Sequence, residues 1–199
     1  MHHVRVGRDG AAPAACRQEG SRCATAPADV RRRRRARRHR QPRGALQRYG
    51  RALVFVVDTN VLVYAANRKS PYHRSCLQLL EAWRQQAGAW HLTWGICYEF
   101  LRVATHPRTL QSPWTVTEAW AFLEAILAAP SLSMLVPTER HAGVLGELTS
   151  RLPHLCGNIL HDVHTAALMR EHGIRTIYTR DSDFHRFPFL EPIDPVTST

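Results

Sequence analysis

Long hydrophobic runs are missing from this 199-residue sequence. No apolar stretch approaches the roughly 20 residues that a membrane-spanning helix needs, and the apolar run 52–57 is too short for the hydrophobic region of a signal peptide. The five cysteines are odd in number, lie far apart and include no CxxC pair, so neither a structural zinc site nor a disulfide framework is indicated. These absences favour a reduced, cytoplasmic protein that does not span a membrane.

Acidic residues are scarce at the N-terminus, and this accounts for the net charge of +11. Residues 1–51 contain 15 of the 27 basic residues, all arginine, but only three acidic ones. Residues 52–199 contain 12 basic and 13 acidic residues, a net charge of −1. The high net charge is therefore a property of the first segment and does not indicate that the rest is a cationic nucleic-acid-binding domain.

The arginine-rich segment 1–51 has no Trp, Phe or Ile, and 32 of its 51 residues are Arg, Ala, Gly or Pro. It cannot bury enough apolar surface to offset the entropy of ordering, so we expect it to be disordered. Three interpretations are open: a basic arm that binds RNA or DNA phosphates, an organellar transit peptide, or translated sequence upstream of a true start near Leu53 or Val54. We favour the third, because the composition is of low complexity and without a repeat.

Residues 52–199 alternate between strand and helix patterns. A continuous apolar run predicts a buried strand over 53–57, and further strands are expected over 90–93, 132–136, 175–178 and, at an edge, 189–194. Helices are expected over 61–66 with Asn60 as N-cap, 73–87, 94–105 with Thr93 as N-cap, and 115–128 with Thr115 as cap. Two more are expected, one capped by Thr138 and running to about 150, and one over 158–172 that ends before Gly173. This order predicts an α/β domain, a parallel sheet of four to five strands flanked by helices on both faces. In such sheets ligands bind beyond the carboxyl ends of the strands.

Four carboxylates occupy positions that would suit apolar or neutral residues. Asp58 follows the first strand and Asp181 the fourth, while Glu99 and Asp162 lie within apolar helices that would flank the same crevice. Each has an ordinary explanation when taken alone. Asp58 could cap a turn, Asp162 could face solvent, Asp181 could form an Asx-turn with Asp183, and Glu99 could pair with Arg102.

Taken together, the same four residues point to a metal site. Carboxylates gathered at one edge of a sheet raise each other's pKa unless a cation neutralises them. A set of ligands that are all oxygen suits Mg²⁺ or Mn²⁺. An ion held in this way can activate water and stabilise the leaving oxygen in phosphodiester hydrolysis.

Four segments carry a specific resemblance: VVDTNVLVYA at 56–65, YEFLRV at 98–103, NILHDVHTAALMREHGI at 158–174 and YTRDSDF at 178–184. In this order and spacing they resemble a PIN-domain ribonuclease, most closely the toxin of a VapC-type toxin–antitoxin pair, over residues 53–196. Residues 1–51 have no counterpart, so the resemblance implies an extension at 1–51 followed by a PIN domain at 52–199.

The resemblance also implies an activity and its residues. It implies a Mg²⁺- or Mn²⁺-dependent endoribonuclease that cleaves RNA, forms a homodimer and is neutralised by a cognate antitoxin whose segment covers or enters the acidic crevice. Asp58, Glu99, Asp162 and Asp181 match the acidic quartet of the family, and Asp183 an additional metal-binding acid. The supporting positions are Thr59, Thr179, Asn60 and Arg102; Arg102 would either tether a carboxylate or contact a phosphate.

Other interpretations of the same residues are possible. An inactive PIN scaffold that binds nucleic acid or protein is the main alternative. Aspartyl-phosphate chemistry is disfavoured, because Asn60 stands where a second Asp is needed and the only lysine after residue 51 is the early Lys69. The spacing of His161 and His164 would permit zinc binding, but no third ligand is placed by the sequence, so we expect both to point away from Asp162.

Overall fold

The computed structural model describes residues 54–86, 88–152, 157 and 159–197. The segment 1–51, for which disorder is expected, lies outside the described residues. Five strands form one parallel sheet in the order β3-β2-β1-β4-β5. The strands are β1 (Phe55–Val57), β2 (Trp90–Thr93), β3 (Leu132–Leu135), β4 (Thr176–Tyr178) and β5 (Glu191–Ile193). The predicted α/β class, including a fifth strand at the edge, is confirmed.

Six α-helices and one 3₁₀ helix connect the strands. They are α1 (Thr59–Ala66), α2 (His73–Gln85), α3 (Trp94–Ala104), α4 (Val116–Leu127), α5 (His141–Arg151), α6 (Ile159–Glu171) and η1 (Ser182–Arg186). Thr93 and Thr115 cap α3 and α4 as predicted. Gly173, with a φ of 69°, follows the end of α6, as its place after the apolar pattern indicated. No helix in the described part of the chain is long and apolar enough to cross a membrane.

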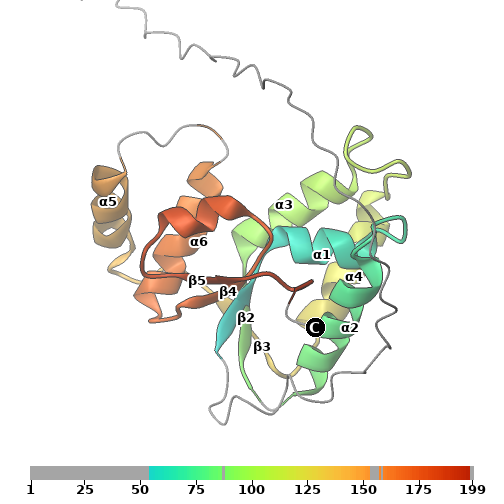
Figure 1. Cartoon of the computed structure of the whole chain (residues 1–199), viewed down its shortest axis with the longest axis horizontal. Coiled ribbons are helices and arrows are strands. Elements are labelled where there is room, and N and C mark those ends of the chain that lie inside the picture. The colour runs from blue at the N-terminus through green and yellow to red at the C-terminus, as the bar shows by residue number, and fades with distance from the viewer. Residues whose placement is uncertain (1–53, 87, 153–156, 158, 198–199) are drawn as a thin grey trace, which may run out of the picture. The chain divides into compact units, whose positions relative to one another are not determined.

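The strand order places helices on both faces of the sheet. The chain moves outward from β1 through β2 to β3 and then returns past β1 to β4. Because such crossovers are right-handed, this reversal puts the two sets of connections on opposite faces. Figure 1 shows α2 and α4 on one side and α5 and α6 on the other. All three residues of β1 are buried, as expected for a strand covered on both faces.

The reversal also creates a switch point between β1 and β4, which are neighbours in the sheet. The loops that follow the carboxyl ends of these two strands lead into α1 and η1, and in sheets of this type a ligand crevice lies beyond the strand ends at such a reversal. Helix α3 packs against both α1 and α6. The elements that carry the four predicted carboxylates therefore meet at this end of the sheet.

Two predicted helix starts are wrong. Helix α1 begins at Thr59 rather than Val61, and its N-cap is Asp58, whose Oδ1 accepts from the Thr59 amide at 2.6 Å. Helix α5 begins at His141 and its N-cap is Arg140. Thr138 lies before it, where its hydroxyl oxygen accepts from the Arg140 amide at 3.2 Å while its own amide and hydroxyl donate to Oε2 of Glu171 at 2.8 and 2.7 Å. In both cases a carboxylate is the accepting group. Asp58 adjoins α1 in the sequence, whereas Glu171 lies 33 residues from Thr138, so only the second contact was hidden from the sequence pattern.

Candidate active site

Asp58 stands at the carboxyl end of β1 and is 7% exposed. Its backbone amide continues the sheet by donating to the carbonyl oxygen of Tyr178 on β4 at 3.0 Å. Its carboxylate accepts three hydrogen bonds: Oδ1 from the Thr59 amide at 2.6 Å, and Oδ2 from the Asn60 amide group at 2.5 Å and the Thr179 hydroxyl at 2.6 Å. This side chain is fixed in one orientation at the base of the crevice.

Thr179 connects the ends of the two central strands. Besides donating to Asp58, its hydroxyl oxygen accepts from Nδ2 of Asn60 and from the amide of Asp181, both at 2.9 Å. The Asn60 oxygen in turn accepts from the Arg180 amide at 3.2 Å. Thr179 and Asn60, predicted as supporting residues, therefore join the loop after β1 to the loop after β4.

Glu99 reaches the crevice from α3 and is held on both oxygens. The Thr59 hydroxyl donates to its Oε2 at 3.1 Å, and Nη2 of Arg102 lies 3.3 Å from its Oε1. Arg102 thus contacts a site carboxylate, although its side chain is 61% exposed and leaves room for a second partner. The ordinary ion pair suggested by the i,i+3 spacing is present, and it lies at the site.

Asp162, Asp181 and Asp183 bring one oxygen each to within 4.8 Å of one another. Asp162 is half-buried on α6, whereas Asp181 precedes η1 and its Oδ1 accepts from the Asp183 amide at 2.9 Å. The Asx-turn of Asp181 that was expected as an ordinary explanation is therefore present, and it brings the carboxylates of Asp181 and Asp183 close to that of Asp162. Among the described residues this is the one group of three or more His, Cys, Asp or Glu side chains that could hold a metal ion.

Mutual repulsion and burial perturb two of these acids. The pKa of Asp58 is raised from 3.8 to about 7, mainly by burial and also by the charges of Glu99 and Asp181, against the lowering effect of its hydrogen bonds with Thr179 and Thr59. Burial also raises the pKa of Asp162 to about 7, with added contributions from Asp58, Asp181 and Glu99. All four predicted acids therefore interact electrostatically, although they come from four distant parts of the sequence.

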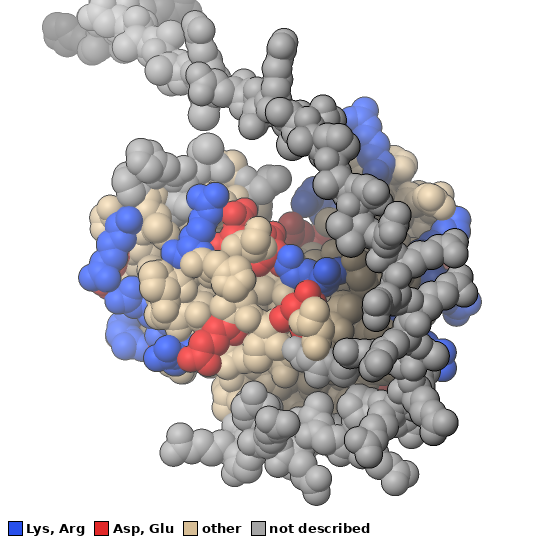
Figure 2. All heavy atoms as spheres, in the orientation of Figure 1, with Lys and Arg blue, Asp and Glu red and all other residues tan. Residues whose placement is uncertain are grey.

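The site fits a divalent cation on its own chemistry. The converging groups are all carboxylates, and burial together with the neighbouring negative charges raises the pKa of two of them to about 7. Hard ions such as Mg²⁺ and Mn²⁺ prefer these oxygen ligands and tolerate water in the remaining positions. Figure 2 shows acidic side chains gathered, partly recessed, where α1, α3 and α6 meet, with basic side chains on either side.

The two histidines beside Asp162 do not join the cluster. His161 is exposed, and the ring of His164 packs against His141 of α5 at 5.3 Å between centroids. A basic residue that the sequence analysis missed is Arg186, whose Nε lies 3.0 Å from Oδ1 of Asp183. The i,i+3 spacing to Asp183 was a usable signal, but it requires knowing that residues 182–186 form a helical turn.

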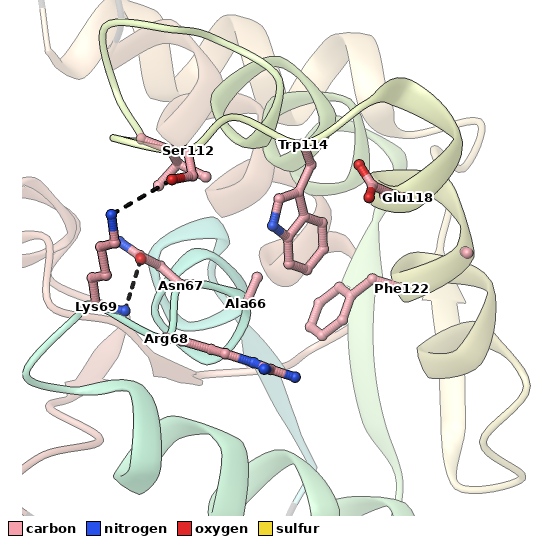
Figure 3. A pocket seen from close by; sticks show the side chains of 10 residues that line it. Ala66, Asn67, Arg68, Lys69, Ser112, Trp114, Glu118 and Phe122 are labelled. Atoms are coloured by element: carbon pink, nitrogen blue, oxygen red, sulfur yellow. Dashed lines mark hydrogen bonds between the residues drawn. The ribbon is translucent and has the colours of Figure 1, made fainter.

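A second hollow lies at the opposite end of α1, about 12 Å along the helix axis from Asp58. Trp114 and Phe122 supply aromatic surface, and Arg68 and Lys69 lie at its edge (Figure 3). Its lining comprises Ala66, Asn67, Arg68, Lys69, Leu110, Ser112, Trp114, Glu118, Ala121 and Phe122. It contains one carboxylate and none of the predicted site residues, so it is separate from the acidic crevice.

Comparisons with known proteins identify the family to which this chain belongs. The family model of the PIN domain matches residues 55–190. Ribonuclease VapC48 from Mycobacterium tuberculosis is 33% identical over 138 residues, which cover 69% of this chain and 94% of the relative. Ribonuclease VapC37 from the same species is 35% identical over 136 residues, 66% of this chain and 90% of the relative. The chain belongs to the PIN domain family.

Solved structures agree on the fold. VapBC2 from Rickettsia felis, bound to a DNA fragment of its promoter, matches with a TM-score of 0.51 at 19% identity and covers 71% of this chain and 98% of that one. VapC20 from M. tuberculosis, a toxin that cleaves the sarcin–ricin loop, matches with a TM-score of 0.51 at 20% identity over 69% of this chain and 97% of that one. The PIN-like parallel sheet predicted from the sequence is confirmed.

Proposed function

We propose that the protein is a Mg²⁺- or Mn²⁺-dependent endoribonuclease that hydrolyses RNA phosphodiester bonds. The observation that carries this proposal is the meeting of Asp58, Glu99, Asp162 and Asp181 at the switch point of the sheet, with Asp183 beside them. Two relatives of 33% and 35% identity bear the name ribonuclease, which supports RNA as the substrate class.

The proposed ligands of the metal are Asp58, Glu99, Asp162, Asp181 and Asp183. When bound, a divalent ion would supply a positive charge that lowers the pKa of water and stabilises the leaving oxygen. Thr179, Asn60 and the Thr59 amide hold the Asp58 carboxylate in place, and the Thr59 hydroxyl orients Glu99. The five acids supply the negative charge, and the hydrogen bonds to Asp58 and Glu99 set the positions of these two carboxylates before the ion arrives, which limits the reorganisation needed for binding.

The partners follow from the family resemblance. We propose a cognate antitoxin that covers or enters the acidic crevice, a homodimer, and a cytoplasmic location. One of the solved structures of similar fold is itself a VapBC2 assembly from R. felis. In the described part of the chain, Cys76 and Cys97 are buried free thiols, which agrees with a reducing compartment.

A cleavage assay tests the proposal. The full chain, purified without antitoxin, is incubated with structured RNA and Mn²⁺, Mg²⁺ or chelator, beside Asp58→Ala. Glu191→Gln is the matched control, because Glu191 is an exposed acid paired with Arg175 outside the crevice. We expect cleavage that requires metal, disappears in Asp58→Ala and survives in Glu191→Gln. A folded chain that binds Mn²⁺ but cleaves no RNA would instead support the alternative, an inactive PIN scaffold.

A further inference from the structure

RNA binding at this crevice has an electrostatic difficulty. Single-stranded RNA carries a negative charge at each phosphate, and proteins hold it mainly through Lys and Arg. The crevice presents five carboxylates, and residues 52–199 have a net charge of −1. A substrate strand that passes the metal site therefore needs cationic side chains immediately beside the acids.

Among the described residues, Arg102, Arg180 and Arg186 lie close to the crevice, and Arg180 has partners outside the acidic cluster. The guanidinium of Arg180 stacks over the ring of Tyr72, 4.0 Å from its centroid, and its Nε lies 3.2 Å from Asp194. Its side chain is only 27% exposed. Stacking and the ion pair both hold Arg180 against the body of the protein, so we assign it a structural role.

Arg102 and Arg186 are placed differently. Each is about half or more exposed, at 61% and 54%, and each forms its ion pair with a carboxylate of the proposed metal site, Glu99 or Asp183. Their elements, α3 and η1, both pack against α6, which carries Asp162. The two guanidinium groups therefore approach the acidic cluster from two different elements, both packed against the helix that carries Asp162.

We propose that Arg102 and Arg186 hold the RNA phosphates on either side of the position where the strand is cut. This inference rests on the proposed function. When a cation neutralises Glu99 and Asp183, each arginine loses much of its attraction to its present carboxylate. Exposed i,i+3 ion pairs are weak, whereas a guanidinium can bind a phosphate through two parallel charge-assisted hydrogen bonds. Each arginine thus exchanges a carboxylate for a phosphate as metal and substrate bind.

The test compares Arg102→Ala and Arg186→Ala with Arg175→Ala in the full chain. Arg175 is 64% exposed and also pairs with an acid, Glu191, at 3.1 Å, but it precedes β4, at the end of the sheet opposite the crevice. All three variants lose one positive charge and retain the same arginine-rich segment. The binding of a fluorescein-labelled single-stranded RNA is measured by anisotropy with Ca²⁺ at several salt concentrations.

We expect Arg102→Ala and Arg186→Ala each to weaken RNA binding several-fold. Each should also make the slope of log K against log salt concentration less steep by about 0.7, which corresponds to one lost phosphate contact on a single strand. Arg175→Ala should match the unaltered chain. Slopes equal to that of Arg175→Ala would overturn the proposal.

A calorimetric titration with Mn²⁺ in the absence of RNA distinguishes phosphate binding from carboxylate tethering. Loss of a nearby positive charge should leave the Mn²⁺ affinity unchanged or raise it. If the affinity falls while the salt slope stays constant, the arginines only position metal ligands and the proposal is wrong. Cleavage by the unaltered chain is measured separately. If the unaltered chain cleaves RNA but its variants bind RNA with unchanged salt slopes, this inference is wrong and the proposed function still stands.

Discussion

The hydroxyl of Thr179 donates to Oδ2 of Asp58 at 2.6 Å, across 121 residues of sequence. The same oxygen accepts from the Asn60 side chain and the Asp181 amide. One buried hydroxyl thus uses its single hydrogen and both lone pairs to align the carboxylate after β1 with the turn after β4. The precision of the crevice therefore depends on this one group.

Replacing the Thr179 hydroxyl with a methyl group should destabilise the protein. Thr179→Val keeps the shape but removes three hydrogen bonds and leaves the Asn60 side chain and the Asp181 amide without this acceptor. We expect a loss of about 2–3 kcal/mol in the free energy of unfolding, measured by urea denaturation without metal. Thr179→Ser, which retains the hydroxyl, should lose much less. Equal stability of the valine and serine variants would contradict this prediction.

Asp162→Asn should have opposite effects on stability and on metal binding. Asn keeps the size of the side chain and removes a charge that burial and four neighbouring acids disfavour. At pH 8 without metal we expect a gain of about 1 kcal/mol, a figure already reduced for the solvent screening of a half-buried group. Mn²⁺ affinity should fall by at least tenfold in calorimetric titration. A destabilised variant would show that the acids do not repel one another in the metal-free protein.

The stability of the metal-free protein should fall as pH rises from about 4 to about 7. The pKa of Asp58 and of Asp162 is near 7 in the folded protein, well above the ordinary value of 3.8, so in this interval the folded state binds more protons than the unfolded state. The Tm in chelator is therefore expected to be lower at pH 7.5 than at pH 5. Saturating Mn²⁺ should reverse this order, because the ion binds the deprotonated carboxylates. The lowered pKa of His91 and of His164 acts in the opposite direction in this interval, so the unaltered chain is compared with Asp162→Asn. A Tm difference between the two that does not change with pH would refute the raised pKa of Asp162.

Glu171 should contribute to the stability of the fold but not to the catalytic rate. Burial acts to raise its pKa, but hydrogen bonds from Thr138 and His141 outweigh burial, and the net pKa is lowered. We expect Glu171→Ala to cost about 2–4 kcal/mol, because it removes the acceptor of the Thr138 amide and hydroxyl.

Two measurements check the role of Glu171. Since its pKa is lowered, its contribution to stability should be lost as pH falls below about 4.5, the opposite sign to the effect of Asp58. The kcat per folded molecule should be unchanged at a temperature where the Glu171→Ala variant is fully folded. A lower kcat under that condition would place Glu171 in the active machinery.

A chain that begins at Leu53 should fold and act like the full chain. The family match spans 55–190, and β1 begins at Phe55. We expect the same Tm and the same rate of metal-dependent RNA cleavage for residues 53–199. A truncated chain that folds but binds RNA with a much weaker salt dependence would show that the arginine-rich segment is an RNA-binding arm. Failure to fold would show that the segment belongs to the domain.

The sequence alone was sufficient for the strand and helix order, because apolar runs, caps such as Thr93 and Thr115, and Gly173 act over a few residues. The resemblance of four short segments also identified Asp58, Glu99, Asp162 and Asp181 as a set, and the structure places all four within electrostatic range of one another. The sequence offered Asp58 as the cap of a turn but did not place the start of α1 at Thr59, and it did not predict the contact of Thr138 with Glu171. That contact joins residues 33 positions apart and depends on which carboxylate the folded chain brings near.

Tertiary structure alone decided the geometry of the crevice. The hydrogen bonds that fix Asp58 come partly from Thr179, and the repulsion that raises the pKa of Asp162 comes from acids on other elements. It also decided that Arg180 faces Tyr72 whereas Arg102 and Arg186 stay at the acidic cluster. Local sequence sets backbone preference within a few residues, but electrostatic interaction and burial depend on distances in space, and only the packing of helices on both faces of the sheet determines those distances.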